Sequence, residues 1–166
     1  MSGIGELTVL AQGDREIVMS RVFSAPRELV FKAWTQPAFL KRWLTGPPQW
    51  SLEVCEIDLR VGGQGRFVWR HRESGAEMGL TNVYREILPP ARLVATERFD
   101  EPWYPGEAIG TIELFEINGQ TLLRQTLLYD SQETRDAVLE SPMESGVAFS
   151  FDQLEALLPA MVSAER

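Results

Sequence analysis

The stretch of residues 15–44 constrains the fold most, because an extended segment runs directly into two short helices. Residues 15–23 alternate as a strand does. Pro26 then stands where a helix would begin, a position that tolerates its fixed φ and its missing N–H. Apolar residues at helical spacing predict a first short helix through Trp34 and a second that reaches Trp43. These two tryptophans must be buried against the rest of the chain, and we expect a cavity there.

The chain after this stretch is predicted to form a meandering antiparallel sheet. Segments with strand-like alternation are separated by Gly, Pro and Asn-Gly turn signals. They cover residues 50–59, 66–72, 77–88, 93–99, 107–117 and 121–129. Because these strands follow one another without intervening helices, they favour antiparallel pairing over repeated βαβ units.

The end of the chain is predicted to be helical. Residues 131–139 indicate a short helix, and Ser141 and Glu144 have the spacing of a capping box that starts another. From Met143 to Leu158, apolar residues recur at steps of three and four, which gives one apolar face over about four turns. A helix of this kind packs across the concave face of a curved sheet. The predicted fold class is therefore α+β, a curved antiparallel sheet wrapped around a long C-terminal helix.

Composition and charge exclude several classes of function. The 166 residues suit a single domain, 1–166, with a core from about 15 to 158. A net charge of −8 disfavours binding to nucleic acid, which needs a basic surface. No segment reaches the roughly 18 apolar residues of a membrane span, so we expect no membrane insertion. The single cysteine, Cys55, rules out an intramolecular disulfide and suits a reducing compartment, so the expected location is the cytoplasm.

Three segments, in order, resemble the family of homologues of the activator of the Hsp90 ATPase. They read VMSRVFSAPRELVFKAWTQPAFLKRWL, VYREILPPARLVATERF and RDAVLESPMESGVAFSFDQLEALL. This family belongs to the START-like (SRPBCC) superfamily, and the resemblance implies a helix-grip fold with a cavity between the sheet and the long helix. Members of the superfamily use that cavity for very different functions. The sequence departs from the family pattern at Leu44, Asn82 and Pro142, and the change at Leu44 alters the expected lip of the pocket.

Aromatic side chains are the first candidates for the wall of such a cavity. Trp34, Trp43 and Trp69 lie in or beside elements that should face it, and an aromatic, mostly apolar lining suits a small hydrophobic ligand. Ordinary core packing is the alternative, since large aromatic residues dominate cores in any case. Phe99 joins this group because it shares a strand face with Glu97.

Charged and small residues supply the remaining candidates. Glu97 and Arg124 lie inside strands, and a charged group that faces a cavity must be paired or have a perturbed pKa. The alternative is that these side chains face solvent on the outer side of the sheet. The strand register decides between the two, and the sequence leaves it open. On the long helix, Met143 and Gly146 are candidates, and the small Gly146 either admits a ligand or allows close packing.

Evidence for catalysis in the sequence is slight. His71, the only histidine, shares a strand face with Trp69 and could act as a general base, although a strand-end histidine is more often structural. One histidine and one cysteine make a poor metal site, so no metal and no cofactor are predicted. The catalytic residues, if there are any, stay unassigned.

Three hypotheses for function follow. The first is a non-catalytic protein that binds a small hydrophobic or amphipathic molecule, with a role in a stress response suggested by the family. The second is an enzyme of the polyketide cyclase or hydrolase kind that uses the same cavity. The third, implied only by the family name, is a module that interacts with a chaperone. A homodimer is compatible with a sheet that has an outer face.

Overall fold

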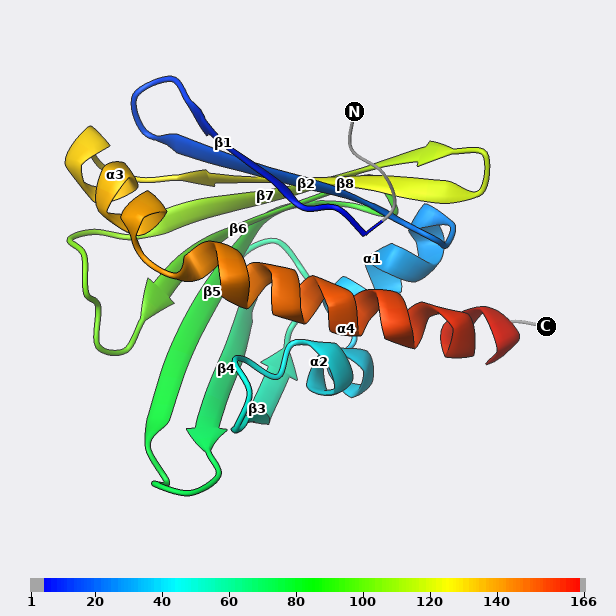
Figure 1. Ribbon diagram of the computed structural model, residues 1–166, viewed down its shortest axis with the longest axis horizontal. Coiled ribbons are helices and arrows are strands. Elements are labelled where there is room, and N and C mark those ends of the chain that lie inside the picture. Colours follow the sequence, from blue (N-terminus) through cyan, green and yellow to red (C-terminus); the bar gives the residue numbers. More distant parts are fainter. Residues whose placement is uncertain (1–4, 165–166) are drawn as a thin grey trace.

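The computed structural model describes residues 5–164, which form one sheet and four helices (Figure 1). The strands are β1 Thr8–Gln12, β2 Glu16–Phe23, β3 Trp50–Ile57, β4 Gln64–His71, β5 Glu77–Leu88, β6 Arg92–Phe99, β7 Ala108–Ile117 and β8 Gln120–Leu128. The helices are α1 Arg27–Thr35, α2 Pro37–Trp43, α3 Gln132–Glu140 and α4 Met143–Ala164. This is the predicted α+β helix-grip fold, with the two short helices directly after β2.

The eight strands form one antiparallel sheet in the order β1-β2-β8-β7-β6-β5-β4-β3. β2 pairs with β8 along its whole length, so the strand before α1 lies beside the last strand of the chain. From β3 to β8, each strand pairs with the next, as in a meander. In Figure 1, β4 and β5 run steeply across the direction of β2 and β8, and this twist makes one face of the sheet concave.

The long helix α4 lies across the concave face, and α1 and α2 pack against its C-terminal half (Figure 1). Pro26 is the N-cap of α1, and Pro37 begins α2. The start of α4 differs from the prediction in one detail. The Ser141 hydroxyl donates its hydrogen bond back to the carbonyl of Val138, so it closes α3 and does not cap α4.

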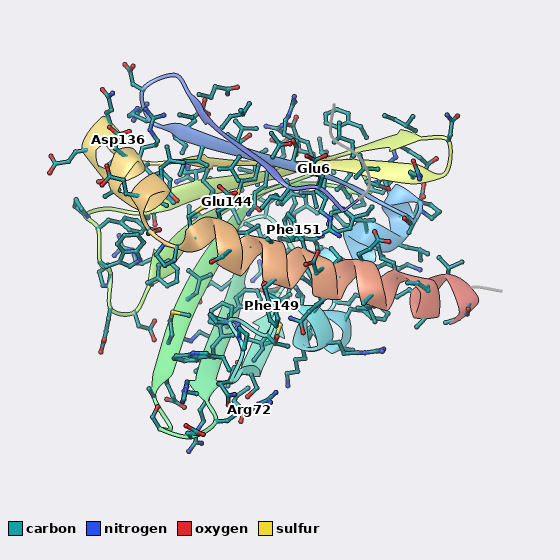
Figure 2. The ribbon with its side chains drawn as sticks, in the orientation of Figure 1. Glu6, Arg72, Asp136, Glu144, Phe149 and Phe151 are labelled. Atoms are coloured by element: carbon teal, nitrogen blue, oxygen red, sulfur yellow. The ribbon has the colours of Figure 1, made fainter. Side chains whose placement is uncertain are left out.

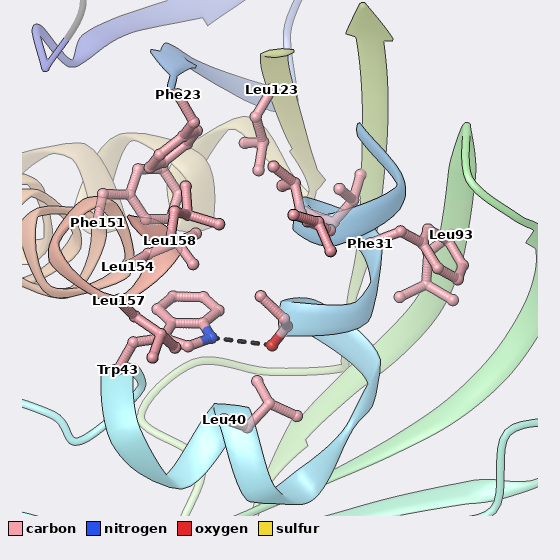
Figure 3. Close-up of a cluster of buried hydrophobic side chains, with 14 of the residues drawn as sticks. Phe23, Phe31, Leu40, Trp43, Leu93, Leu123, Phe151, Leu154, Leu157 and Leu158 are labelled. Carbon is pink, nitrogen blue, oxygen red and sulfur yellow. Dashed lines mark hydrogen bonds between the residues drawn. The ribbon is translucent and has the colours of Figure 1, made fainter. Parts of the chain in front are cut away.

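The main hydrophobic core lies where α4, α1 and α2 meet the sheet (Figure 3). Leu154 and Leu158 of α4 are fully buried there, together with Phe23 at the end of β2. Phe151 packs edge-to-face on Phe23, with 5.5 Å between the ring centroids. Figure 2 shows that the side chains of Phe149 and Phe151 point to different sides of α4. Each step along an α-helix turns the side chain by about 100°, so residues two positions apart lie on nearly opposite sides.

The inner face of β2 also carries a charge that the sequence reading did not single out. Arg21 is only 2% exposed, and its Nη1 donates to Oδ1 of Asp152 on α4 at 2.8 Å. Its guanidinium carbon lies 5.0 Å from the centroid of the Phe23 ring. This ion pair ties the sheet to the long helix.

None of the helices among residues 5–164 is long and apolar enough to cross a membrane.

Candidate functional site

A cavity of about 340 Å³ lies between the sheet and the N-terminal half of α4. It forms because the packing of α4 is uneven along its length. The C-terminal half packs against α1 and α2, whereas Met143, Gly146 and Val147 of the first turns border the cavity, to which α1 and α2 contribute Trp34 and Leu40. Strands β4 to β8 form the floor, and the loop after α2 forms part of the rim through Gly46 and Pro47.

Two tryptophans form much of the aromatic wall. Trp34, near the end of α1, and Trp69, on β4, both line the cavity. The indole Nε1 of Trp69 donates to the carbonyl of Leu44 at 2.8 Å, and its ring stacks on Phe67 with 6.0 Å between centroids. The wall at Trp69 is therefore held in place by the segment that follows α2.

Trp43 lies behind this wall and does not line the cavity. It is fully buried in the core, and its Nε1 donates to the carbonyl of Ala33 at 2.9 Å (Figure 3). Its ring meets that of Trp34 edge-to-face at 4.9 Å. The two tryptophans that the sequence pairs thus have separate positions, with Trp34 at the cavity surface and Trp43 supporting it from the core.

Glu97 is the only charged side chain among the described residues that line the cavity. Alternation along β6 directs it to the same side as Ala95 and Phe99, which also line it. Its carboxylate lies over Gly110 of the neighbouring strand β7, where an added Cβ would come within 2.6 Å of Oε2. A glycine inside a strand often marks close approach of another group, and here that group is the Glu97 carboxylate.

The environment of Glu97 disfavours its charged form. Burial raises the pKa of the Glu97 carboxyl from 4.5 to about 7. Within the described residues, no side chain makes a hydrogen bond or an ion pair to this carboxylate. Tyr104 and Tyr129 lie near enough for the Glu97 charge to act on them, and burial first and that charge second raise the pKa of both phenols. A carboxyl that titrates near neutral pH is thus held in a mostly apolar cavity.

Two of the charged or titratable candidates lie elsewhere. Arg124 projects from the outer face of the sheet, where its Nη2 donates to Oε1 of Glu113 at 3.0 Å. His71 lies at the end of β4, where its ring meets that of Trp50 at 5.3 Å and its Nδ1 accepts a hydrogen bond from the Ser74 backbone N–H. Neither residue lines the cavity, because β8 alternation turns Arg124 outward and β4 carries His71 past the rim.

The two candidates on α4 do lie at the cavity. Met143 and Gly146 line it in the first turns of the helix, and a Cβ added at Gly146 would meet no atom within 4 Å. Gly146 therefore faces open space, and close packing does not account for it.

Polar lining residues that the sequence reading missed are Asn82, Gln125 and Ser150. The Nδ2 of Asn82 donates to the Thr96 carbonyl at 2.7 Å, one residue from Glu97. The sequence does not give the strand register. Only the register shows that Gln125 faces the cavity while its neighbour Arg124 faces outward.

The other chemical groups considered from the sequence have no role at this site. Cys55 is buried in the core, and burial raises the pKa of its thiol to about 11, which keeps it protonated and poorly nucleophilic. Between residues 5 and 164, no cluster of three or more His, Cys, Asp or Glu residues could hold a metal ion.

Solved structures with the same architecture come from several bacteria. A protein from Rhodobacter sphaeroides is 31% identical, with 93% of this chain and 99% of that chain covered and a TM-score of 0.87. One from Chromobacterium violaceum is 32% identical over 86% of this chain and 96% of that one, with a TM-score of 0.71. One from Nitrosomonas europaea, 24% identical over 92% and 99%, has a TM-score of 0.80. No match is found among the curated proteins.

The sequence pattern and the fold agree on the family. Residues 24–159 match the family described as Activator of Hsp90 ATPase homolog 1-like protein. That range runs from the residues just before α1 to the last turns of α4, so it includes every element that borders the cavity. This chain therefore belongs to the Activator of Hsp90 ATPase homolog 1-like family, within the START-like superfamily.

Proposed function

We propose that this protein binds a small, mostly apolar molecule in the cavity between the sheet and α4. The observation that carries the proposal is the cavity itself, about 340 Å³ in volume and lined by aromatic and aliphatic side chains with a few polar groups. Ligand sites in proteins are concave spaces of this size and composition. Burial of an apolar ligand contributes about 25 cal/mol per Å² removed from water, so a cavity that is largely apolar favours such a molecule.

A fluorescent apolar probe, N-phenylnaphthylamine, tests the proposal directly. We expect saturable binding at one site per chain, with transfer of excitation from Trp34 and Trp69 because both line the cavity. Native mass spectrometry of freshly purified protein would show whether a natural ligand is retained.

Two variants of α4 make the test specific. Gly146→Leu adds a side chain where the cavity is open, so binding of N-phenylnaphthylamine should fall at least about tenfold. Ala156→Leu adds the same bulk on the exposed side of the helix and should leave binding unchanged. The absence of saturable binding by the unaltered protein, or an equal loss in both variants, would contradict the proposal.

An acid–base enzyme acting in the same cavity is the second candidate, and Glu97 is the observation that favours it. A carboxyl with a pKa of about 7 is suited to donate and accept protons at neutral pH. The polyketide cyclase or hydrolase hypothesis would use it in that role. If turnover of an ester such as para-nitrophenyl butyrate is detected, Glu97→Gln should abolish it, whereas His71→Ala should not. Activity that survives Glu97→Gln would eliminate this candidate.

The chaperone hypothesis rests on the family name alone and stays a prediction. A pull-down with purified Hsp90, and a measurement of its ATPase rate with and without this protein, would test it.

A further inference from the structure

We propose that the ligand carries a protonated amine, which Glu97 binds at its end of the cavity. This inference rests on the proposed function, because it names the chemical class of the molecule that the cavity takes. It starts from an unpaired charge. Arginine, lysine and histidine are absent from the described residues that line the cavity, so none of these residues supplies a cationic partner for the Glu97 carboxylate.

The arginines of the neighbouring strands are paired elsewhere. Arg98, the next residue on β6, lies 3.8 Å from Glu107, and Arg85 of β5 lies 3.8 Å from the same carboxylate. Arg92 and Arg124 both pair with Glu113 on the outer face of the sheet. These arginines therefore lie outside the cavity. Glu97, the one carboxylate among the described residues that line it, has no cation beside it.

The position of the carboxylate is also built into the strands. Gly110 leaves the space in which Oε2 lies, since any side chain there would displace it. Nearby, the Tyr104 ring is in edge-to-face contact with the rings of Phe99 and Tyr129, with centroid distances of 6.4 Å and 5.5 Å. Of these rings, Phe99 lines the cavity, and an aromatic ring beside a carboxylate favours an organic cation over a neutral group.

Energetics favour the same ligand class. The Glu97 side chain is half-buried, and a carboxylate withdrawn from water without a partner is costly. An ammonium group of a ligand reduces that cost while it gains a charge-assisted hydrogen bond. The titratable groups that face Glu97 are Tyr104 and Tyr129, whose raised pKa values keep both phenols neutral at physiological pH. Glu97 is then the group that controls ionisation at this end of the cavity, through its pKa of about 7.

A matched pair of probes, para-butylbenzylamine and para-butylbenzyl alcohol, tests the inference by isothermal titration calorimetry. The two molecules share an apolar body and differ in one terminal group. At about pH 8.5, where Glu97 is ionised and the amine still protonated, we expect the amine to bind at least about tenfold more tightly than the alcohol. Its affinity should fall as the pH drops through about 7 toward about 5.5, because Glu97 takes up a proton.

The Glu97→Gln variant supplies the decisive comparison. It should lose both the preference for the amine over the alcohol and the pH dependence of that preference, whereas Glu77→Gln, which removes an exposed carboxylate from β5, should keep both. If the alcohol binds but the amine gains nothing, or if the preference survives in Glu97→Gln, the inference is overturned and the proposed function stands. If neither probe binds the unaltered protein, both are contradicted.

Discussion

At the scale of single residues, Glu97 is the most unusual feature, since its carboxyl lies in a cavity whose described lining residues include no cation. Its raised pKa has a consequence for stability as well as for binding. Between the ordinary pKa of 4.5 and the folded value of about 7, the folded state holds a proton that the unfolded state has lost. The contribution of Glu97 to the free energy of unfolding should therefore decrease as the pH rises through this range, and level off above it.

Glu97→Gln should remove that decrease. Relative to the unaltered protein, the variant should gain up to about 3 kcal/mol in unfolding free energy between about pH 4.5 and about pH 7. Urea denaturation at a series of pH values measures this difference. Glu77→Gln, which removes an exposed carboxylate from β5, is the control and should keep the slope of the unaltered protein. Parallel curves for the unaltered protein and Glu97→Gln would contradict the assignment.

The tryptophans show what sequence can and cannot predict at this scale. Helical spacing predicted that Trp34 and Trp43 would be buried by neighbouring elements, and Trp43 is fully buried whereas Trp34 is half-buried. It could not say which ring would reach the cavity, because that depends on how α1 and α2 cross. The same limit applied to Glu97 and Arg124, where alternation gives two faces and only the pairing of strands decides which face is inside.

At the scale of elements, α4 combines a packed half with a half that borders the cavity. Its apolar periodicity and its place across the sheet were readable from the sequence, and it starts at Met143, one residue after the Pro142 that a Ser141 cap would make the first helical residue. The hydrogen bond of Ser141 could not be predicted, because its hydroxyl lies between two helices and can bond to either. In the structure it donates to the carbonyl of Val138 in the preceding helix.

Gly146 gives a test of this division within α4. Gly146→Ala adds a Cβ in open space and replaces the residue that helices tolerate least after proline, so stability should rise by about 0.5–1 kcal/mol. Gly63→Ala is the contrasting variant, because its Cβ would lie 2.2 Å from the carbonyl oxygen of Asp58, and it should destabilise by about 1–3 kcal/mol. Thermal and urea denaturation compare the two. A loss of stability in Gly146→Ala would mean that the space is filled.

At the scale of the whole molecule, the sequence predicted the element order well, including the antiparallel meander from β3 to β8. It did not predict that β2 pairs with β8, although this contact joins residues about a hundred positions apart and completes the concave face. Local patterns report which segments are strands, while the order of strands depends on the packing of the whole. The cavity is a product of that global arrangement, so the sequence supplied candidates for its lining but could not decide which of them face it.

The uneven packing also predicts uneven stability across the fold. Backbone amides exchange with solvent through local opening, and opening is easiest where few buried apolar contacts are lost. The second half of α4 has Leu154 and Leu158 fully buried between the sheet and the short helices, whereas residues 143–147 lie over the cavity. Hydrogen exchange followed by mass spectrometry should therefore show faster exchange in residues 143–150 than in residues 151–161.

A bound ligand should change this pattern locally. N-phenylnaphthylamine would add apolar contacts to the first half of α4, so exchange should slow several-fold in residues 143–150 and little in residues 151–161, which are already packed. In Gly146→Leu, the added side chain fills part of the same space, so the probe should have no such effect. Equal exchange along α4, or uniform protection on adding the probe, would contradict this prediction. It holds that core packing stabilises residues 151–161 and that a bound ligand stabilises residues 143–150.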